Sequence, residues 1–151
     1  MKYTLVFALV ALLSTPALSQ QDSGIFLTVP CGKKSPKETV ALTQKTVCLA
    51  SNPMILTSEF QAVKEVRQLN EKIFFDLTLS RKAVETLNRL AANLPSASFA
   101  LVVDKDVFFV FSASALAGNN STLRFEGGMK DQQIFFSTQE KLKALINGGS
   151  Q

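Results

Sequence analysis

The sequence predicts an α+β fold in which about three helices pack on one face of an antiparallel or mixed sheet. Several short segments alternate apolar and polar side chains with the period of two that strands have, and others repeat apolar side chains every three or four residues, as amphipathic helices do. The strand-like segments also follow one another as hairpins instead of alternating strictly with helices, which favours an α+β arrangement. A chain of 151 residues has the length of one domain.

The first 19 residues have the features of a cleavable signal peptide. Lys2 gives a positive start, residues 5–13 are apolar, and Ala17-Leu18-Ser19 places small residues where a signal peptidase cleaves. The apolar run is much shorter than the roughly 20 residues that a transmembrane helix needs. We therefore expect export to the periplasm, in preference to the extracellular space, with no integral membrane segment after cleavage.

Cys31 and Cys48 are the two cysteines of the chain. Oxidising compartments favour pairing of such residues, so the sequence predicts a structural disulfide that closes a polar, turn-rich loop. A redox-active or metal-binding pair is the alternative, although redox pairs usually have the spacing Cys-x-x-Cys.

Residues 20–56 are predicted to form N-terminal strands around the disulfide loop. Segments 25–29 and 45–50 are rich in β-branched and large apolar residues, which favours strands. Asn52-Pro53 favours a turn, because the residue before a proline avoids the helical conformation. These residues and residues 57–147 are expected to form one compact domain.

Residues 57–147 are predicted to contain the three helices and the remaining strands. Each helix is predicted from a capping residue followed by apolar side chains at helical spacing. The predicted helices cover residues 58–69, 80–94 and 138–148. The predicted strands cover residues 72–79, a hairpin over 98–113 that turns at Asp104-Lys105-Asp106, residues 122–126 after a loop at 118–120, and a short strand over 134–136.

Several of these segments also resemble a known family. The residues are Leu77-Thr78-Leu79-Ser80, Phe99-Ala100-Leu101-Val102-Val103-Asp104, Phe125-Glu126-Gly127-Gly128 and Thr138-Gln139-Glu140. In order and type, over about residues 47–145, they resemble the head of the first periplasmic domain of SecD and SecF, the membrane-embedded accessory pair of the Sec protein-export machine. The family's proline after the hairpin strand and its turn glycine are missing, with Ser112 to Ala115 and Lys105 in their places. The resemblance implies a free-standing head that contacts polypeptides, without the family's transmembrane helices and energy coupling.

Three adjacent pairs of phenylalanines fall on predicted strands. Because successive side chains on a strand point to opposite faces, each pair should place one ring on each side of the sheet. The rings predicted in the core are Phe75, Phe109, Phe111, Phe125 and Phe136. The side chains predicted on the second face are Phe74, Val102, Phe108, Val110 and Phe135.

Two interpretations of this second face are open. The N-terminal strands or a second subunit could cover it, which would make its residues part of a core. Alternatively, the face stays partly open as an apolar patch with a polar rim, which marks a binding surface. The resemblance favours the second interpretation, in which Phe74, Val102, Phe108, Val110 and Phe135 are binding residues.

The residue types point to binding in preference to catalysis. The chain has no histidine, which excludes histidine-based triads and histidine metal sites. Asp104 and Asp106 flank a hairpin turn, where aspartate is favoured for its own hydrogen bonds to the backbone. We therefore predict no catalytic residue, no metal site and no cofactor. The formal net charge of +4 is too small to indicate a nucleic-acid partner.

The predicted function is a non-enzymatic periplasmic binding module that engages unfolded polypeptide or a protein partner through the apolar sheet face. The alternative is a periplasmic inhibitor or immunity-type protein that binds one specific enzyme. A small, exported, disulfide-linked domain suits either role.

Overall fold

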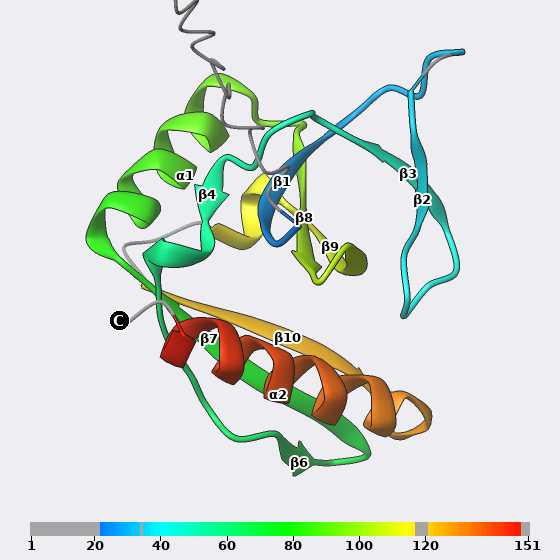
Figure 1. The fold of residues 1–151 in the computed structure, drawn as a ribbon, viewed down its shortest axis with the longest axis vertical. Coiled ribbons are helices and arrows are strands. Elements are labelled where there is room, and N and C mark those ends of the chain that lie inside the picture. Colours follow the sequence, from blue (N-terminus) through cyan, green and yellow to red (C-terminus); the bar gives the residue numbers. More distant parts are fainter. Residues whose placement is uncertain (1–21, 34, 117–120, 149–151) are drawn as a thin grey trace, which may run out of the picture.

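The computed structural model describes residues 22–33, 35–116 and 121–148; the predicted signal peptide and the predicted loop at 118–120 lie outside them. The described residues form an α+β fold, with two antiparallel sheets and two α-helices (Figure 1). The predicted fold class is therefore confirmed in its coarse form. The single sheet and the three helices of the prediction are replaced by two sheets and two helices.

The first sheet has the strand order β2-β3-β1-β8-β9, and β4 also pairs with β1. Its strands are β1 (Gly24–Val29), β2 (Lys37–Thr39), β3 (Thr46–Leu49), β4 (Ile55–Leu56), β8 (Ser98–Val103) and β9 (Asp106–Ser112). The predicted strands at 25–29 and 45–50 and the predicted hairpin at 98–113 are all present. Asp104 and Lys105 make the hairpin turn with positive φ values of 50° and 71°.

The second sheet has the order β10-β7-β5, and β6 also pairs with β7. Its strands are β5 (Phe60–Val63), β6 (Arg67–Leu69), β7 (Lys72–Leu79) and β10 (Thr122–Gly128). The predicted helix at 58–69 is wrong, because this segment forms a short 3-10 turn, β5 and β6 instead. Pairing with the long central strand β7 supplies tertiary hydrogen bonds that outweigh the local helical spacing.

The two α-helices are α1 (Arg81–Asn93) and α2 (Gln132–Gly148). Ser80 caps α1 as predicted: its Oγ accepts a hydrogen bond from the Ala83 amide at 3.1 Å and donates one to the Glu59 carboxylate. The predicted strand at 134–136 and the predicted cap at Thr138 are wrong, because α2 already begins at Gln132. Asp131 lies at this start, where its carboxylate accepts a hydrogen bond from the Gly128 amide at 3.2 Å.

The main core lies between the two sheets and the two helices, and phenylalanine rings fill its centre. The ring centroid of Phe75 on β7 lies 5.5 Å from Phe108, 5.5 Å from Phe125 and 5.7 Å from Phe135 on α2. Helix α2 lies against β5 and β7 and also contacts β8 (Figure 1). The aromatic cluster therefore joins both sheets to α2.

A smaller second core lies on the other face of the first sheet. Phe26, Ala100, Val102 and Val107 are buried there beneath Val40, which is 1 % exposed and follows β2 directly. The Ala41 amide donates a hydrogen bond of 2.8 Å to the Val107 carbonyl. The hairpin of β2 and β3 thus folds over this face, as one of the two interpretations of the sequence required.

A β-bulge changes the orientation of the phenylalanines on β9. Val107 pairs with Val102 and Phe109 with Leu101, so Phe108 is an extra residue without a partner of its own. An extra residue interrupts the alternation of side chains. Phe108 therefore faces the main core, where Phe109 also packs at a ring distance of 6.1 Å. The predicted placement of Phe108 on the second face is wrong for this reason.

The aromatic cluster depends on a glycine, because a Cβ atom at Gly127 would lie 2.5 Å from Cε2 of Phe135. We expect Gly127→Ala to lower the free energy of unfolding by about 1–3 kcal/mol, the usual cost of overpacking a core. Chemical denaturation of the purified variant measures the change. Gly128→Ala is the matched control, because a Cβ atom there has its nearest neighbour at 3.8 Å. Equal losses in the two variants would contradict this explanation.

Candidate functional site

The predicted binding residues do not form one open apolar face. Phe135, Phe108, Val102 and Phe74 are 0 %, 2 %, 4 % and 7 % exposed, and Val110 is half-buried against the second core. The burial of the first four residues contradicts the prediction of an open face, whereas Val110 stays partly exposed. Their alternation was assigned to one sheet, whereas they lie on two sheets and a helix.

The same error applies to Phe136, which was predicted in the core and is 45 % exposed. Successive residues of a helix are turned by about 100° instead of 180°. On α2 this rotation places Phe135 in the aromatic cluster and Phe136 at the surface. Phe136 is therefore the phenylalanine of this pair that a partner can reach.

A cleft of about 350 Å³ lies between the β2–β3 hairpin, the β8–β9 turn and α2. Its volume is within the usual range for a ligand site. The hairpin contributes Thr39 and Ala41, and the first half of α2 contributes the opposite wall. The lining residues are Thr39, Ala41, Val103, Asp106, Val107, Phe108, Gln133, Ile134, Ser137, Thr138 and Lys141.

The floor of this cleft is apolar and its rim is polar. Val103, Val107 and Phe108 are buried, whereas Asp106 and Gln133 are exposed. Lys141 Nζ lies 3.3 Å from a carboxylate oxygen of Asp106, and this ion pair connects α2 to the β8–β9 turn at the rim. Such an arrangement suits an apolar group that carries polar atoms at its edge.

A second, shallower depression lies beside the cleft on α2. Met129, Lys130, Gln132, Phe136 and Glu140 line it, together with Gln133 and Ser137. Because Gln133 and Ser137 also line the cleft, their amide and hydroxyl groups form a polar ridge between the two depressions. We refer to the cleft, the ridge and the second depression together as the α2 groove.

The α2 groove was not predicted from the sequence. Gln133 and Ser137, which form its ridge, lie on the first turns of a helix that was predicted to begin only at Thr138. A clue was Asp131, three residues after Gly128, because an acidic residue near a glycine is a common helix start.

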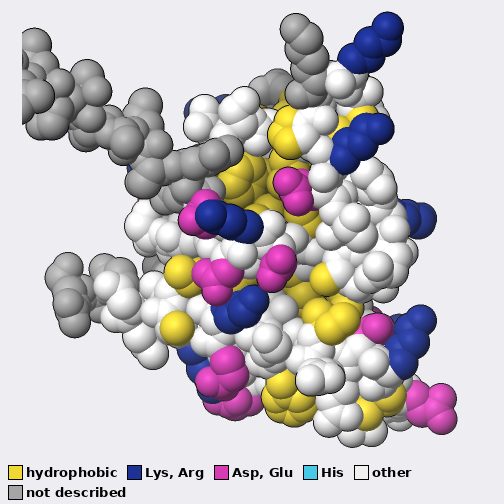
Figure 2. Space-filling model, turned by 45° about the vertical axis from the view of Figure 1, so that its right-hand side comes forward, with side chains coloured by type: hydrophobic (Ala, Val, Ile, Leu, Met, Phe, Trp, Pro, Cys, Tyr) yellow, Lys and Arg dark blue, Asp and Glu magenta, His cyan; other side chains and the backbone are white. Residues whose placement is uncertain are grey.

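Figure 2 shows the surface on the side of the β2–β3 hairpin. Hydrophobic side chains appear there as separate patches between charged side chains, with no single large apolar area. This side therefore carries small apolar patches with charged side chains between them.

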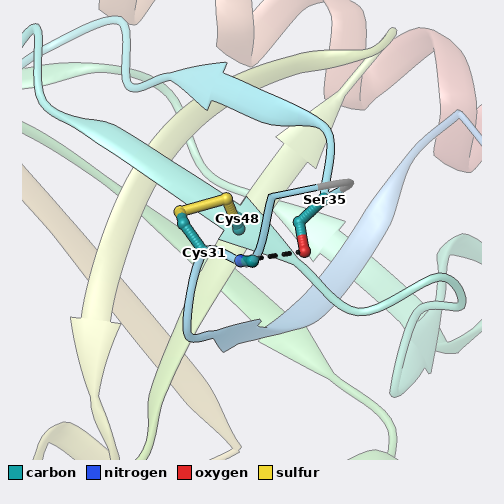
Figure 3. The surroundings of a disulfide bond; sticks show 4 residues. Cys31, Ser35 and Cys48 are labelled. Carbon is teal, nitrogen blue, oxygen red and sulfur yellow. Dashed lines mark hydrogen bonds between the residues drawn. A yellow bond between two sulfur atoms is a disulfide. The ribbon is translucent and has the colours of Figure 1, made fainter.

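The disulfide between Cys31 and Cys48 is present, with the two Cα atoms 5.3 Å apart (Figure 3). Cys48 lies on β3 and is 1 % exposed, and the adjoining loop is closed by a hydrogen bond from the Gly32 amide to Ser35 Oγ at 3.1 Å. The disulfide thus fixes the base of the β2–β3 hairpin. The far end of this hairpin forms one wall of the cleft. A disulfide fits an oxidising compartment.

A charged cluster occupies the outer face of the second sheet. The carboxylate of Asp76, on β7, lies 2.7 Å from Nη2 of Arg67 and 2.7 Å from Nε of Arg124. Both guanidinium groups also lie over the ring of Phe74, at 4.9 Å and 4.5 Å from its centroid. Phe74 and Asp76 are thus covered by arginine side chains instead of another layer of the fold.

The charges of this cluster shift two pKa values. The hydrogen bonds from Arg124 hold the pKa of Asp76 below its ordinary value, with the positive charges of Arg124, Arg67 and Lys64 acting in the same direction against a partial effect of burial. The same hydrogen bonds raise the pKa of Arg124. The carboxylate is therefore ionised throughout the neutral range.

The described residues contain no group of three or more metal-ligating side chains. Neither of the described helices has the length and apolar character needed to span a bilayer. No protein-family model, no curated protein and no solved structure matches this chain.

Asp76 makes the stability of the fold depend on pH. Because its folded pKa lies below the unfolded value of about 3.9, its stabilising effect is complete above that value and is lost as the pH falls through the folded value. At neutral pH we expect Asp76→Asn to lower the free energy of unfolding by about 1–2 kcal/mol, a modest effect because both arginines are half exposed. The loss should shrink as the pH falls below the unfolded value of about 3.9. Denaturation at several pH values measures it, and a loss independent of pH would contradict the assignment.

The disulfide should stabilise the hairpin wall of the cleft. For a bond that spans a sequence separation of 17, we expect the double variant Cys31→Ser and Cys48→Ser to lose about 3 kcal/mol. Hydrogen exchange should show early loss of protection at the Ala41 amide, while Leu101 in the main core stays protected. Simultaneous loss at both amides would show that the hairpin does not open on its own.

Proposed function

We propose that this chain is a non-enzymatic, exported binding module that engages a polypeptide through the α2 groove. The α2 groove takes the place of the apolar sheet face predicted from the sequence, because the residues of that face are mostly buried. The observation that carries it is the polar ridge of Gln133 and Ser137, with the apolar floor of the cleft on one side and Phe136 and Met129 of the second depression on the other.

The shape of the groove suits an extended peptide. Side chains that point the same way along an extended chain are about 7 Å apart, so one apolar side chain can enter the cleft above Ile134 while another packs on Phe136. Between them, the amide of Gln133 and the hydroxyl of Ser137 can donate and accept hydrogen bonds to the backbone of the peptide. Because such hydrogen bonds involve only the peptide backbone, they allow peptides of many sequences to bind.

The compartment and the resemblance agree with this role. The signal-peptide features of residues 1–19 favour export, and the disulfide fits an oxidising compartment such as the periplasm. The resemblance of residues 47–145 to the head of SecD and SecF implies contact with polypeptides, which is the same kind of partner.

Phe136→Ser should weaken binding of unfolded polypeptides about fivefold or more, because burial of part of a phenylalanine ring stabilises a complex by about 1 kcal/mol or more. Fluorescence anisotropy with a labelled, reduced and carboxymethylated protein measures the affinity. Leu94→Ser is the matched control, because Leu94 at the end of α1 is 44 % exposed and lies outside the groove.

Equal affinities of wild type and Phe136→Ser for several unfolded proteins would overturn the proposal. Tight binding of a single folded enzyme in a 1:1 complex, without affinity for unfolded chains, would instead favour the inhibitor role.

A further inference from the structure

The charged cluster on the outer face of the second sheet contains two guanidinium groups and one carboxylate. Asp76 lies within 2.7 Å of both Arg67 and Arg124, so the three side chains together carry one positive charge. Lys64 adds to the positive potential at Asp76. The nearby pair of Lys72 and Glu126, 3.4 Å apart, leaves this excess unchanged.

The two arginines are held in place and keep N–H donors that no side chain in the described part of the chain uses. Arg67 uses Nη2 towards Asp76, and Arg124 uses Nε and Nη2. The remaining guanidinium N–H groups have no partner among these bonds, while the contacts with Asp76 and the Phe74 ring fix the planes of both groups. A guanidinium fixed in this way loses little entropy when it binds a second oxyanion.

The face is open to a partner. The side chains of Arg67 and Arg124 are 50 % and 51 % exposed, and Leu69 at the edge of the same face is 61 % exposed. The core and α2 lie on the opposite side of this sheet. A ligand here therefore leaves the α2 groove free.

We propose that the outer face of the second sheet binds an acidic segment of a polypeptide, with carboxylates on Arg67 and Arg124. The arginines come from β6 and β10, on the two sides of β7. Their Nη2 atoms lie 2.7 Å and 3.1 Å from the same oxygen of Asp76, so the two guanidinium groups lie side by side. Acidic residues two positions apart in an extended segment place their side chains about 7 Å apart. Such a segment laid across the strands presents one carboxylate to each guanidinium. This inference is independent of the proposed function of the α2 groove.

A labelled oligoglutamate peptide tests the inference by fluorescence anisotropy at low ionic strength. We expect Arg67→Gln to weaken binding about fivefold, and salt to weaken it for the wild type. Arg67→Gln leaves the pair of Arg124 and Asp76 intact, which preserves the fold. Arg81→Gln is the matched control, because it removes the same charge from an arginine on α1 that is 93 % exposed.

Asp76→Asn separates a binding role from a structural one. It raises the net charge of the three side chains from +1 to +2, while the amide oxygen of the substituted side chain can still accept hydrogen bonds from the arginines and the Phe74 ring still lies beneath them. We therefore expect tighter binding of oligoglutamate even though the fold is less stable. If that variant does not fold, the comparison of Arg67→Gln with Arg81→Gln still decides.

Three results would overturn the inference: equal weakening by Arg67→Gln and Arg81→Gln, weaker binding by folded Asp76→Asn, or no binding of oligoglutamate. Binding to phosphatidylglycerol vesicles without affinity for oligoglutamate would assign the face to a membrane surface instead.

Discussion

Packing of aromatic rings between the two sheets is the interaction on which the rest of the structure depends. Phe75 on β7, Phe108 on β9 and Phe135 on α2 contact one another at ring distances between 5.2 and 5.7 Å. Rings at these distances stabilise one another beyond the burial of their apolar area. Because each ring comes from a different element, the contacts fix where α2 lies relative to both sheets, and with it both depressions of the α2 groove.

Two local departures from regular structure make this packing possible. The bulge at Phe108 turns a ring into the main core that a regular strand would point away from it. The missing side chain at Gly127 leaves the space that the Phe135 ring occupies. Because α2 begins at Gln132, the first turn of this helix lines the α2 groove.

The sequence predicted much of the fold because several elements follow from local patterns. Signals within a few residues predict the hairpin of β8 and β9, the long strand β7 and helix α1 with its Ser80 cap. The disulfide was predicted in another way, from the presence of two cysteines and the expected export. Residues 58–69 were assigned wrongly because their apolar spacing is helical, whereas the hydrogen bonds to β7 that decide their structure do not show in the pattern of the segment itself. The groove was missed because it combines residues from a hairpin and a helix whose approach only the tertiary structure defines.

The β2–β3 hairpin contributes both to the second core and to the cleft. Val40 closes the second core, and its neighbours Thr39 and Ala41 form a wall of the cleft. A molecule seated against that wall would bind only the closed arrangement, so by thermodynamic linkage its occupancy and the closure of the hairpin reinforce each other. A ligand that fills the cleft would therefore also keep water away from Val40 and Val102 in the second core, although it does not contact these two residues.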